Sequence, residues 1–273
     1  MTGREAVASA RRIVVKVGSS SISGENADRI GPLVDALAAA HGRGADVILV
    51  SSGAIATGLP YLRVEHRPTD LALQQAAAAV GQNLLVVRYQ ERLSGYGIVA
   101  GQVLLTAGDL SNPTHRRNAE RALDKLLELR ILPIVNENDT VATHEIRFGD
   151  NDRLAALVAA LLRADVLVLL SDVDALYTRP PSDPAAEPIL EVPLGDPLDG
   201  VQVGETNTGV GTGGARTKVA AARAAAAAGV GVLLTSTNRV DEALAGAPGG
   251  TWFEPAPRSE EAESPFDLAE AAT

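Results

Sequence analysis

The stretch "RILPIVNENDTVATHEIRFGDNDRLAALVAALLRADVLVLLSDVD", residues 130–174, decides the fold that we predict for this chain. An apolar run at 130–135 is typical of a buried strand, and residues 153–162 have the pattern of a helix. A second apolar run at 164–170 follows that helix. A strand, a helix and a further strand form a βαβ unit, so the stretch predicts a parallel sheet covered by helices.

The same alternation continues on both sides of this unit. We expect further strands at 12–18, 46–50, 97–105 and 230–236, and further helices at 27–41, 71–93, 114–129 and 216–229. A short strand-like run at 251–253 comes last. Alternation over most of a 273-residue chain predicts an α/β fold whose mostly parallel sheet has helices on both faces.

Composition limits the classes of function. The chain has no cysteine, which excludes disulfides, thiolate metal sites and cysteine nucleophiles and suits a cytoplasmic location. No apolar run approaches the ~20 residues of a membrane-spanning helix, and the N-terminal residues do not resemble a secretory signal. The sequence has no basic stripe or aromatic platform, so we expect neither nucleic acid nor a membrane as a partner.

The last 20 residues differ in composition from the rest. They contain six acids and one arginine, which is half of the net charge of −10, and they are rich in proline, glutamate and alanine. Such a segment buries too little apolar surface to fold by itself. We therefore expect one folded domain at 1–253 and a disordered acidic tail at 254–273.

Polar and small residues gather where the predicted strands end. The segments "KVGSSS", "VSSGA", "VNENDT" and "LLSDVD" each follow an apolar run. Open parallel sheets bind ligands at the carboxyl ends of their strands. We therefore expect the functional site at that edge of the sheet.

Two lysines indicate an anionic ligand. Lys16 lies inside the apolar run "IVVKVG", where its charge is costly unless an anion meets it at the strand end. Lys218 ends the glycine-rich stretch "GVGTGGARTK", whose amides could hold phosphates at the start of the next helix. Together the two lysines favour phosphoryl transfer.

Other interpretations of these two segments stay open. The glycines of 209–214 fit the dinucleotide fingerprint, but no convincing strand precedes them. The Walker-type phosphate loop is excluded because Thr217, and not glycine, precedes Lys218. The glycine-rich stretch could also be a plain surface loop, and Lys16 alone could be a strand-edge residue.

The asparagines and aspartates of the opening stretch suit a carboxylate as phosphoryl acceptor. A carboxylate has an unperturbed pKa near ~4, so it is ionised at neutral pH and needs no general base. If the acceptor is an amino acid, "NEND" (136–139) and "GDND" (149–152) would hold its ammonium group. The amides of "SGA" (52–54) at a helix start would hold its α-carboxylate.

Six motifs occur in a characteristic order: "VVKVGSS", "VSSGAIATG", "VNENDTVATHEI", "FGDNDRLAAL", "LLSDVDALY" and "GTGGARTK". In this order they resemble the glutamate 5-kinases of the amino-acid kinase family, over about residues 11–253. "NENDTVAT" together with "GDND" carries most of the specificity. The resemblance implies a three-layer α/β/α sandwich and the ATP-dependent phosphorylation of L-glutamate to L-glutamyl 5-phosphate, the first step of proline biosynthesis.

The resemblance also implies roles for single residues. Lys16 and Lys218 would neutralise the transferring phosphoryl group, and Asp152 would orient both lysines. The other ATP-contacting positions are Gly18, Ser171, Asp172, Thr212, Gly213, Gly214, Ala215, Arg216 and Thr217. The glutamate-contacting positions are Ser52, Gly53, Ala54, Asn136, Asp139, Asp150 and Asn151, and glycine at 18 and 53 would allow close backbone approach.

Cofactors and partners are implied in the same way. ATP would arrive with Mg²⁺ carried on its phosphates, without a metal ligand from the protein. L-proline is the implied feedback inhibitor, and the reductase that consumes L-glutamyl 5-phosphate is an implied partner. The implied assembly is a homo-oligomer.

The sequence departs from the family pattern in three places. The C-terminal PUA domain of many members is not expected here, because the acidic tail follows the kinase domain directly. Ala215 and Arg216 stand where relatives often have methionine and a small residue, and Ser19 replaces a more usual threonine. None of these departures removes a catalytic group.

Alternatives remain for the function and for single residues. Another enzyme of the family, acting on acetylglutamate, aspartate, carbamate or a nucleoside monophosphate, is one alternative, and a catalytically silent proline or glutamate sensor is another. Asp150 or Asp152 could simply cap the following helix. We expect Glu137 to be a structural or solvated neighbour and His144 to be solvated.

Overall fold

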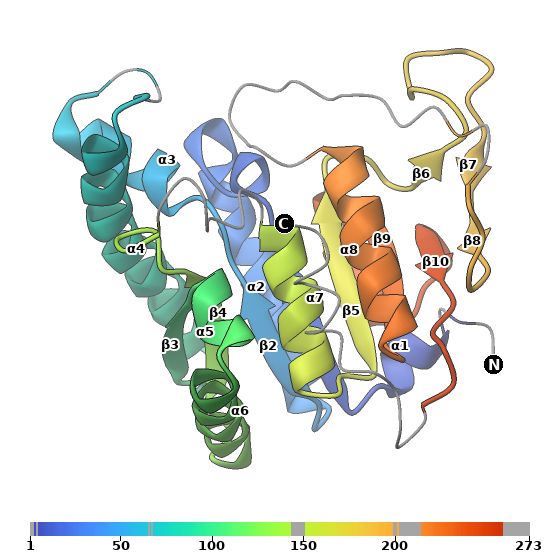
Figure 1. Cartoon of the computed structure of the whole chain (residues 1–273), viewed down its shortest axis with the longest axis horizontal. Helices are drawn as coiled ribbons and strands as arrows, with labels where there is room; N and C mark the ends of the chain where they lie inside the picture. Colours follow the sequence, from blue (N-terminus) through green and yellow to red (C-terminus); the bar gives the residue numbers. More distant parts are fainter. Residues whose placement is uncertain are drawn as a thin grey trace.

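The computed structural model describes residues 3, 5–64, 66, 68–142, 151–198, 201 and 214–258. Its central element is an eight-stranded sheet with the order β3-β4-β2-β1-β5-β9-β10-β8 (Figure 1). The strands are β1 (Arg12–Lys16), β2 (Asp46–Val50), β3 (Ala100–Leu105), β4 (Leu132–Glu137), β5 (Val166–Ser171), β8 (Glu191–Val192), β9 (Gly231–Ser236) and β10 (Thr251–Phe253). Only the pair β9–β10 is antiparallel among these strands, so the predicted mostly parallel sheet is confirmed.

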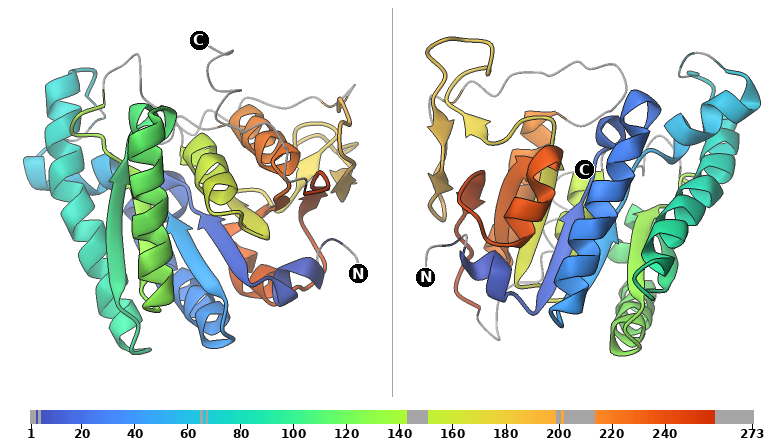
Figure 2. Two further views of the ribbon diagram at one scale, coloured as in Figure 1. Left: turned by 60° about the horizontal axis from the view of Figure 1, so that its bottom comes forward. Right: turned by 180° about the vertical axis from the view of Figure 1, so that it is seen from behind.

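Helices cover both faces of the sheet (Figures 1 and 2). One face carries α1 (Glu5–Ser9), α2 (Ile30–Gly42), α3 (Ala54–Gly58), α4 (Leu71–Ser94) and α9 (Val240–Leu244). The other carries α5 (Ala107–Ser111), α6 (Pro113–Glu128), α7 (Asn151–Leu161) and α8 (Ala215–Ala227). The expected three-layer α/β/α sandwich is therefore present.

Strand β1 explains why the sheet lies in the middle of the molecule. Ile13 and Val15 pack into the core on the α2 and α4 side, whereas Val14 packs into the core on the α7 and α8 side. All three side chains are fully buried. A strand that is buried on both faces requires a continuous apolar run, as parallel strands usually have.

Two long helices begin at side chains that cap them. Asp70 precedes α4, and its Oδ1 accepts a hydrogen bond from the backbone N–H of Leu73 at 3.0 Å. Asn112 precedes α6 and caps the amides of the first turn, with Pro113 in the first helical position. Such caps satisfy backbone donors that have no partner inside the helix, which is why the helices start there.

Helices α3 and α4 touch through two glycines. A Cβ atom added to Gly58 would lie 1.9 Å from the carbonyl oxygen of Ala77, and one added to Gly81 would lie 1.8 Å from that of Ala54. Any larger residue would force the two backbones apart. The two contacts therefore hold α4 against both ends of α3.

Several boundaries differ from the expected ones. The strand expected at 97–105 starts at Ala100, because Gly97 (φ +69) belongs to the turn that follows α4. Residues 24–29 form 3₁₀ turns (η2, Gly24–Arg29), so the helix expected from residue 27 starts at Ile30.

Strand β4 extends two residues beyond the predicted apolar run, because its pairing with β3 continues to the register pair Leu105↔Glu137. A small antiparallel sheet of β6 (Leu176–Tyr177) and β7 (Pro188–Ile189) flanks the proline-rich residues 178–187, and the sequence pattern did not indicate it.

Three short 3₁₀ turns complete the elements: η1 (Ser19–Ser21), η3 (Leu59–Leu62) and η4 (Thr237–Arg239). Within the part of the chain that the structure describes, no helix combines the length and apolar character needed to traverse a bilayer. Contacts with the core continue beyond residue 253, since Ala256 N donates to the carbonyl of Ala226 at 2.8 Å.

Candidate active site

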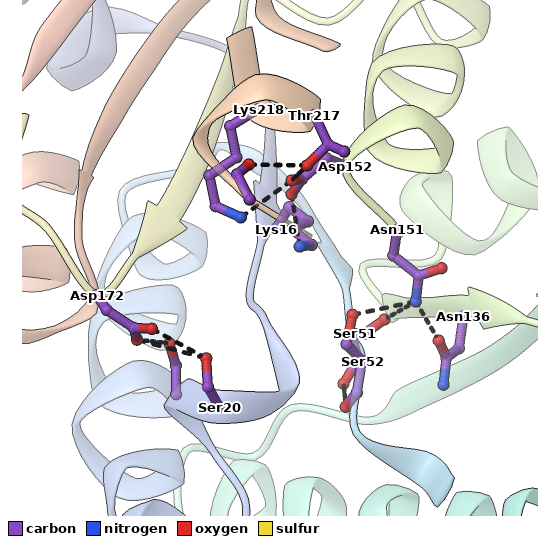
Figure 3. A network of polar contacts seen from close by, with 12 residues as sticks. Lys16, Ser20, Ser51, Ser52, Asn136, Asn151, Asp152, Asp172, Thr217 and Lys218 are labelled. Atoms are coloured by element: carbon purple, nitrogen blue, oxygen red, sulfur yellow. Dashed lines mark hydrogen bonds and ion pairs between the residues drawn. The ribbon is translucent and has the colours of Figure 1, made fainter. Parts of the chain in front are cut away.

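A buried aspartate between two lysines forms the centre of the candidate site (Figure 3). The Nζ atom of Lys16 lies 2.5 Å from Oδ1 of Asp152, and that of Lys218 lies 3.0 Å from Oδ2. Asp152 is 0% exposed, Lys16 2% and Lys218 9%. The structure thus brings together the three residues for which the sequence analysis expected catalytic roles.

The three side chains come from three elements that meet at the carboxyl edge of the sheet. Lys16 is the last residue of β1, which lies between β2 and β5. Asp152 is in the first turn of α7, and Lys218 is in the first turn of α8. The chain order β1, β2 on one side and later β5 on the other creates a topological switch point there, which is where parallel sheets bind ligands.

The charges of this cluster are not balanced within it. Two ammonium groups share one carboxylate, so the three side chains together have one formal positive charge. A buried excess charge is costly unless a counter-charge reaches it. Two ammonium groups that lie this close together suit the binding of an anionic group.

The residues before Lys218 lie at the start of α8. Gly214 is the N-cap of the helix, Ala215 and Arg216 begin it, and the hydroxyl of Thr217 lies 3.2 Å from Oδ2 of Asp152 and 2.9 Å from the carbonyl of Gly214. Thr212 and Gly213 lie outside the described residues.

Gly18 follows the strand that ends at Lys16. A Cβ atom added to Gly18 would lie 3.9 Å from Nζ of Lys16, so a side chain there would occupy space beside the ammonium group. This distance is an ordinary van der Waals contact, so the close backbone approach expected at Gly18 stays a prediction. Gly53 has a different need for glycine: its φ of +90° is in the left-handed region, at the turn that starts α3 with Ala54.

A chain of carboxamides lies next to the charged cluster. Asn151 Nδ2 is 2.6 Å from the carbonyl oxygen of Ser51, 3.2 Å from Oγ of Ser52 and 2.6 Å from Oδ1 of Asn136. Asn136 Nδ2 donates in turn to Oε1 of Gln82 at 2.6 Å. Two adjacent residues thus have different partners: Asn151 hydrogen-bonds to the carboxamide of Asn136, and Asp152 pairs with the two lysines.

Ser171 and Asp172 lie at the end of β5. The carboxylate of Asp172 is engaged by two hydroxyls, Ser20 Oγ at 3.2 Å from Oδ2 and Ser21 Oγ at 3.2 Å from Oδ1 (Figure 3). The turn after β1 and the end of β5 are therefore tied together, and the side chain of Asp172 has a structural contact beside any contact to a ligand.

The remaining predicted residues lie at or beyond the end of β4. Asp139 is half-buried in the turn that follows the strand. Glu137 is only 6% exposed, so the alternative of a solvated side chain is wrong for it. Asp150 and His144 lie outside the described residues. For Asp152, a cap alone does not describe the contacts, since its carboxylate meets both lysines.

Sequence reasoning missed two polar residues of α4. The hydroxyl of Tyr89 lies 3.0 Å from Oγ of Ser51, and burial raises the pKa of Tyr89 well above its ordinary value. Gln82 holds Asn136, as described above. Both are on the buried face of α4, together with Ala78 and Leu85. A glutamine at a helical spacing that otherwise carries apolar residues was the available signal for Gln82.

Comparisons with known proteins show the family of this chain. A model of the amino acid kinase family matches residues 11–236. A glutamate 5-kinase of Clavibacter sepedonicus is 74% identical over 256 residues, which cover 94% of this chain and 98% of that protein. A glutamate 5-kinase of Streptomyces coelicolor is 59% identical over 92% of this chain but over only 68% of its own length.

Solved structures are similar in fold at low sequence identity. The carbamate kinase from Giardia lamblia bound to AMP-PNP superposes with a TM-score of 0.67 at 17% identity, covering 91% of this chain and 100% of that chain. At this identity the likeness supports the fold alone.

Proposed function

Because this chain belongs to the amino acid kinase family, and within it to the glutamate 5-kinases, we propose that it transfers the γ-phosphoryl group of ATP to the side-chain carboxylate of L-glutamate. The products are L-glutamyl 5-phosphate and ADP, as in the first step of proline biosynthesis. The observation that carries the proposal is the buried cluster of Lys16, Asp152 and Lys218 beside the carboxamide chain of Asn136 and Asn151.

The two lysines act on the transferring group. A side-chain oxygen of glutamate forms the new bond to the γ-phosphorus, while the bond from that phosphorus to the oxygen of the leaving ADP breaks. The loose transition state spreads negative charge over the phosphoryl oxygens, and preorganised cations stabilise it. Lys16 and Lys218 supply these cations, and Asp152 positions both ammonium groups.

The nucleotide lies against the start of α8 and the turn after β1. The expected contacts are Gly18, Ser171, Asp172 and the segment 212–218. Backbone amides and a lysine at a helix start, with a glycine beside Lys16, suit a triphosphate. Mg²⁺ bound to the nucleotide phosphates would neutralise part of their charge.

The acceptor lies against the carboxamides. The Oδ1 atom of Asn151 points away from its three hydrogen-bond acceptors, Asp139 supplies a carboxylate, and together they hold the ammonium of glutamate. The backbone at Ser52, Gly53 and Ala54 holds the α-carboxylate, with Asn136 and Asp150 close by. No general base is required because the attacking carboxylate is already ionised.

The proposal includes the wider setting of the enzyme. The chain assembles as a homo-oligomer in the cytoplasm, L-proline inhibits it, and the reductase that consumes its unstable acyl phosphate is a partner. This setting rests on the assignment to the glutamate 5-kinases, the name that relatives at up to 74% identity carry. Size-exclusion chromatography and inhibition by L-proline test its first two parts.

A panel of acceptors tests the main reaction. The chain is assayed with ATP, Mg²⁺ and one of L-glutamate, N-acetyl-L-glutamate, L-aspartate or carbamate, and ADP release is measured. We expect turnover with L-glutamate and at most a trace with N-acetyl-L-glutamate, which lacks the ammonium group. Preference for the acetylated acceptor would overturn the assignment, and binding of glutamate without ADP release would indicate a sensor.

A further inference from the structure

Gln82 lies on the buried face of α4, behind the carboxamides of the site. Gln82 is 8% exposed, and its Oε1 accepts a hydrogen bond from Nδ2 of Asn136 at 2.6 Å. Asn136 itself is 1% exposed and comes from β4. A short hydrogen bond between two buried amides from different elements requires that both are held in fixed orientations.

The orientation of each amide in this chain depends on the next one. Oδ1 of Asn136 accepts from the backbone N–H of Glu137 at 2.9 Å and from Nδ2 of Asn151 at 2.6 Å. If the amide of Asn136 were reversed, its Nδ2 would face two donors. Its Nδ2 must then point toward α4, where only an acceptor can satisfy it, and Gln82 Oε1 is that acceptor.

The last amide of the chain is thereby set as well. Nδ2 of Asn151 faces the carbonyl of Ser51, the hydroxyl of Ser52 and Oδ1 of Asn136, so its own Oδ1 is directed away from all of them (Figure 3). An oxygen presented in this way can accept a hydrogen bond from an ammonium group, whereas a reversed amide would present a donor and repel it.

We propose that Gln82 is a positioning residue for the acceptor: it holds Asn136, which holds Asn151 with its oxygen toward the ammonium of the substrate. This proposal rests on the function proposed above and adds a residue to it. Gln82 acts through Asn136 and does not touch the phosphoryl group, which lies at the lysine cluster. It therefore governs recognition of the acceptor and leaves the nucleotide site unaffected.

The backbone around Gln82 is suited to this task. The neighbouring Gly81 packs against Ala54 and Gly58 of α3 so closely that no Cβ atom fits, which fixes the height of this turn of α4. One further contact from α4, between Tyr89 and Ser51, holds the end of β2. Helix α4 thus contacts both Asn136, through Gln82, and Ser51, through Tyr89.

The test uses Gln82→Met, which keeps the length and volume of the side chain but removes the acceptor. We expect the KM for L-glutamate to rise about tenfold, because an amide of Asn136 is left buried without its partner, while the KM for ATP changes by less than about twofold. The matched control is Gln74→Met. Gln74 is on the same face of α4, is also 8% exposed, and donates to the carbonyl of Pro68 at 2.7 Å.

A structural effect and a positioning effect give different results. If Gln82 only stabilises α4, both variants lower the melting temperature and neither changes the KM for glutamate selectively, and the proposal is then wrong. A double-mutant cycle with Asn136→Ala adds a second criterion. We expect the pair to have a KM within about twofold of Asn136→Ala alone, whereas multiplied effects would show that Gln82 acts independently of Asn136.

Two other outcomes of the experiment also test the role of Gln82. If Gln82→Met does not fold, Gln82→Ala in the same cycle gives the same comparison. If the wild-type chain does not turn over L-glutamate, the proposed function has failed, and the cycle is then read from the shift in melting temperature that L-glutamate causes. A shift that is equal in wild type and Gln82→Met would overturn the role of Gln82 in that case.

Discussion

Helix α7 lies between two clusters of charged residues that differ in burial and in the partners of their carboxylates. At its start, Asp152 is fully buried and meets two lysine ammonium groups. Just beyond its end, Asp165 accepts from the backbone N–H groups of Arg11 and Arg12 at 2.8 and 3.0 Å and pairs with Arg258 at 3.3 Å. The side chain of Asp165 is 34% exposed.

The difference in burial distinguishes a carboxylate that stabilises the fold from one that lies in the candidate active site. The contacts of Asp165 include fixed backbone amides, and its surroundings include water, so the cluster is satisfied without a ligand. At the other end, two lysine ammonium groups contact one carboxylate that is shielded from water, where electrostatic interactions are strong. The buried charges of this chain therefore lie where we propose that a charged ligand binds.

The largest expected effect comes from removing a lysine of the buried cluster. Lys218→Ala or Lys16→Ala should lower kcat by about 10³-fold or more, because the lost charge acts mainly on the transition state. Binding of L-glutamate, measured by calorimetry, should stay close to that of the wild type. Steady-state kinetics with ATP and L-glutamate give the rates.

Strand β1 supplies the control for this prediction. Arg12 is its first residue and Lys16 its last, and Arg12 pairs with Asp46 at 3.3 Å and donates to the carbonyl of Leu162 at 2.7 Å. Arg12→Ala should lower the melting temperature but leave kcat within a few-fold. Near-normal turnover of Lys16→Ala, or a collapse in Arg12→Ala, would remove the distinction between the two edges.

The second effect concerns the acceptor side of the carboxyl edge. Asn151→Ala and Asp139→Asn should each raise the KM for L-glutamate by about 10- to 100-fold, since a hydrogen bond to a charged group is worth about 1.5–3 kcal/mol. The KM for ATP should change much less. Separate KM determinations for the two substrates check this, and an effect confined to ATP would show that these residues serve the nucleotide.

Much of the fold could be predicted because it depends on continuous patterns. The apolar runs of β1, β2 and β5 are long enough to be recognised one at a time, and alternation with helices then fixes a parallel sheet. Lys16 was noticeable for the same reason, since a charge interrupts such a run.

The missing parts depend on contacts between residues far apart in the chain. Asn136 was expected near a loop, but pairing of β4 with β3 buries it in the strand. The bonds from Ser20 and Ser21 to Asp172 join segments more than 150 residues apart. Neither contact produces a pattern among neighbouring residues of the sequence, so only the three-dimensional structure shows it.

The third effect is one of stability at the amino edge. Asp165→Ala should lower the free energy of unfolding by about 1–3 kcal/mol, because two backbone donors lose their acceptor. In a chain of this size, each kcal/mol corresponds to about 2–4 °C in the melting temperature. The kinetic constants at a temperature well below the transition should be unchanged within about twofold. The exposed Asp241→Ala serves as a control that should alter neither quantity.

The smallest effect is expected from the acidic tail, and two truncations divide it at an informative place. The guanidinium of Arg258 donates to the carbonyl of Ala164 at 2.7 Å and to that of Gly229 at 3.3 Å, and it reaches Asp165. These contacts are at the amino edge, about 13 Å from Lys16 along the strands, because Lys16 pairs with Leu169, four residues after Asp165. A chain that ends at Arg258 keeps them, whereas a chain that ends at Pro255 loses them.

We therefore expect the chain that ends at Arg258 to match the full-length protein in melting temperature, in oligomeric state and in kcat within a few-fold. The chain that ends at Pro255 should keep the same kcat and lose less stability than Asp165→Ala, about 1 kcal/mol or less, because the side chain of Arg258 is 53% exposed and water can replace its contacts. Thermal unfolding, size-exclusion chromatography and the coupled assay measure the three properties. If removal of 259–273 alone dissociates the oligomer or stops turnover, the apolar residues Phe266 and Leu268 serve a neighbouring subunit or a partner enzyme, and the tail is a functional part of the chain. If instead both truncations leave stability unchanged, the contacts of Arg258 contribute little, and the amino edge is held by Arg12 and Asp165 without help from the tail.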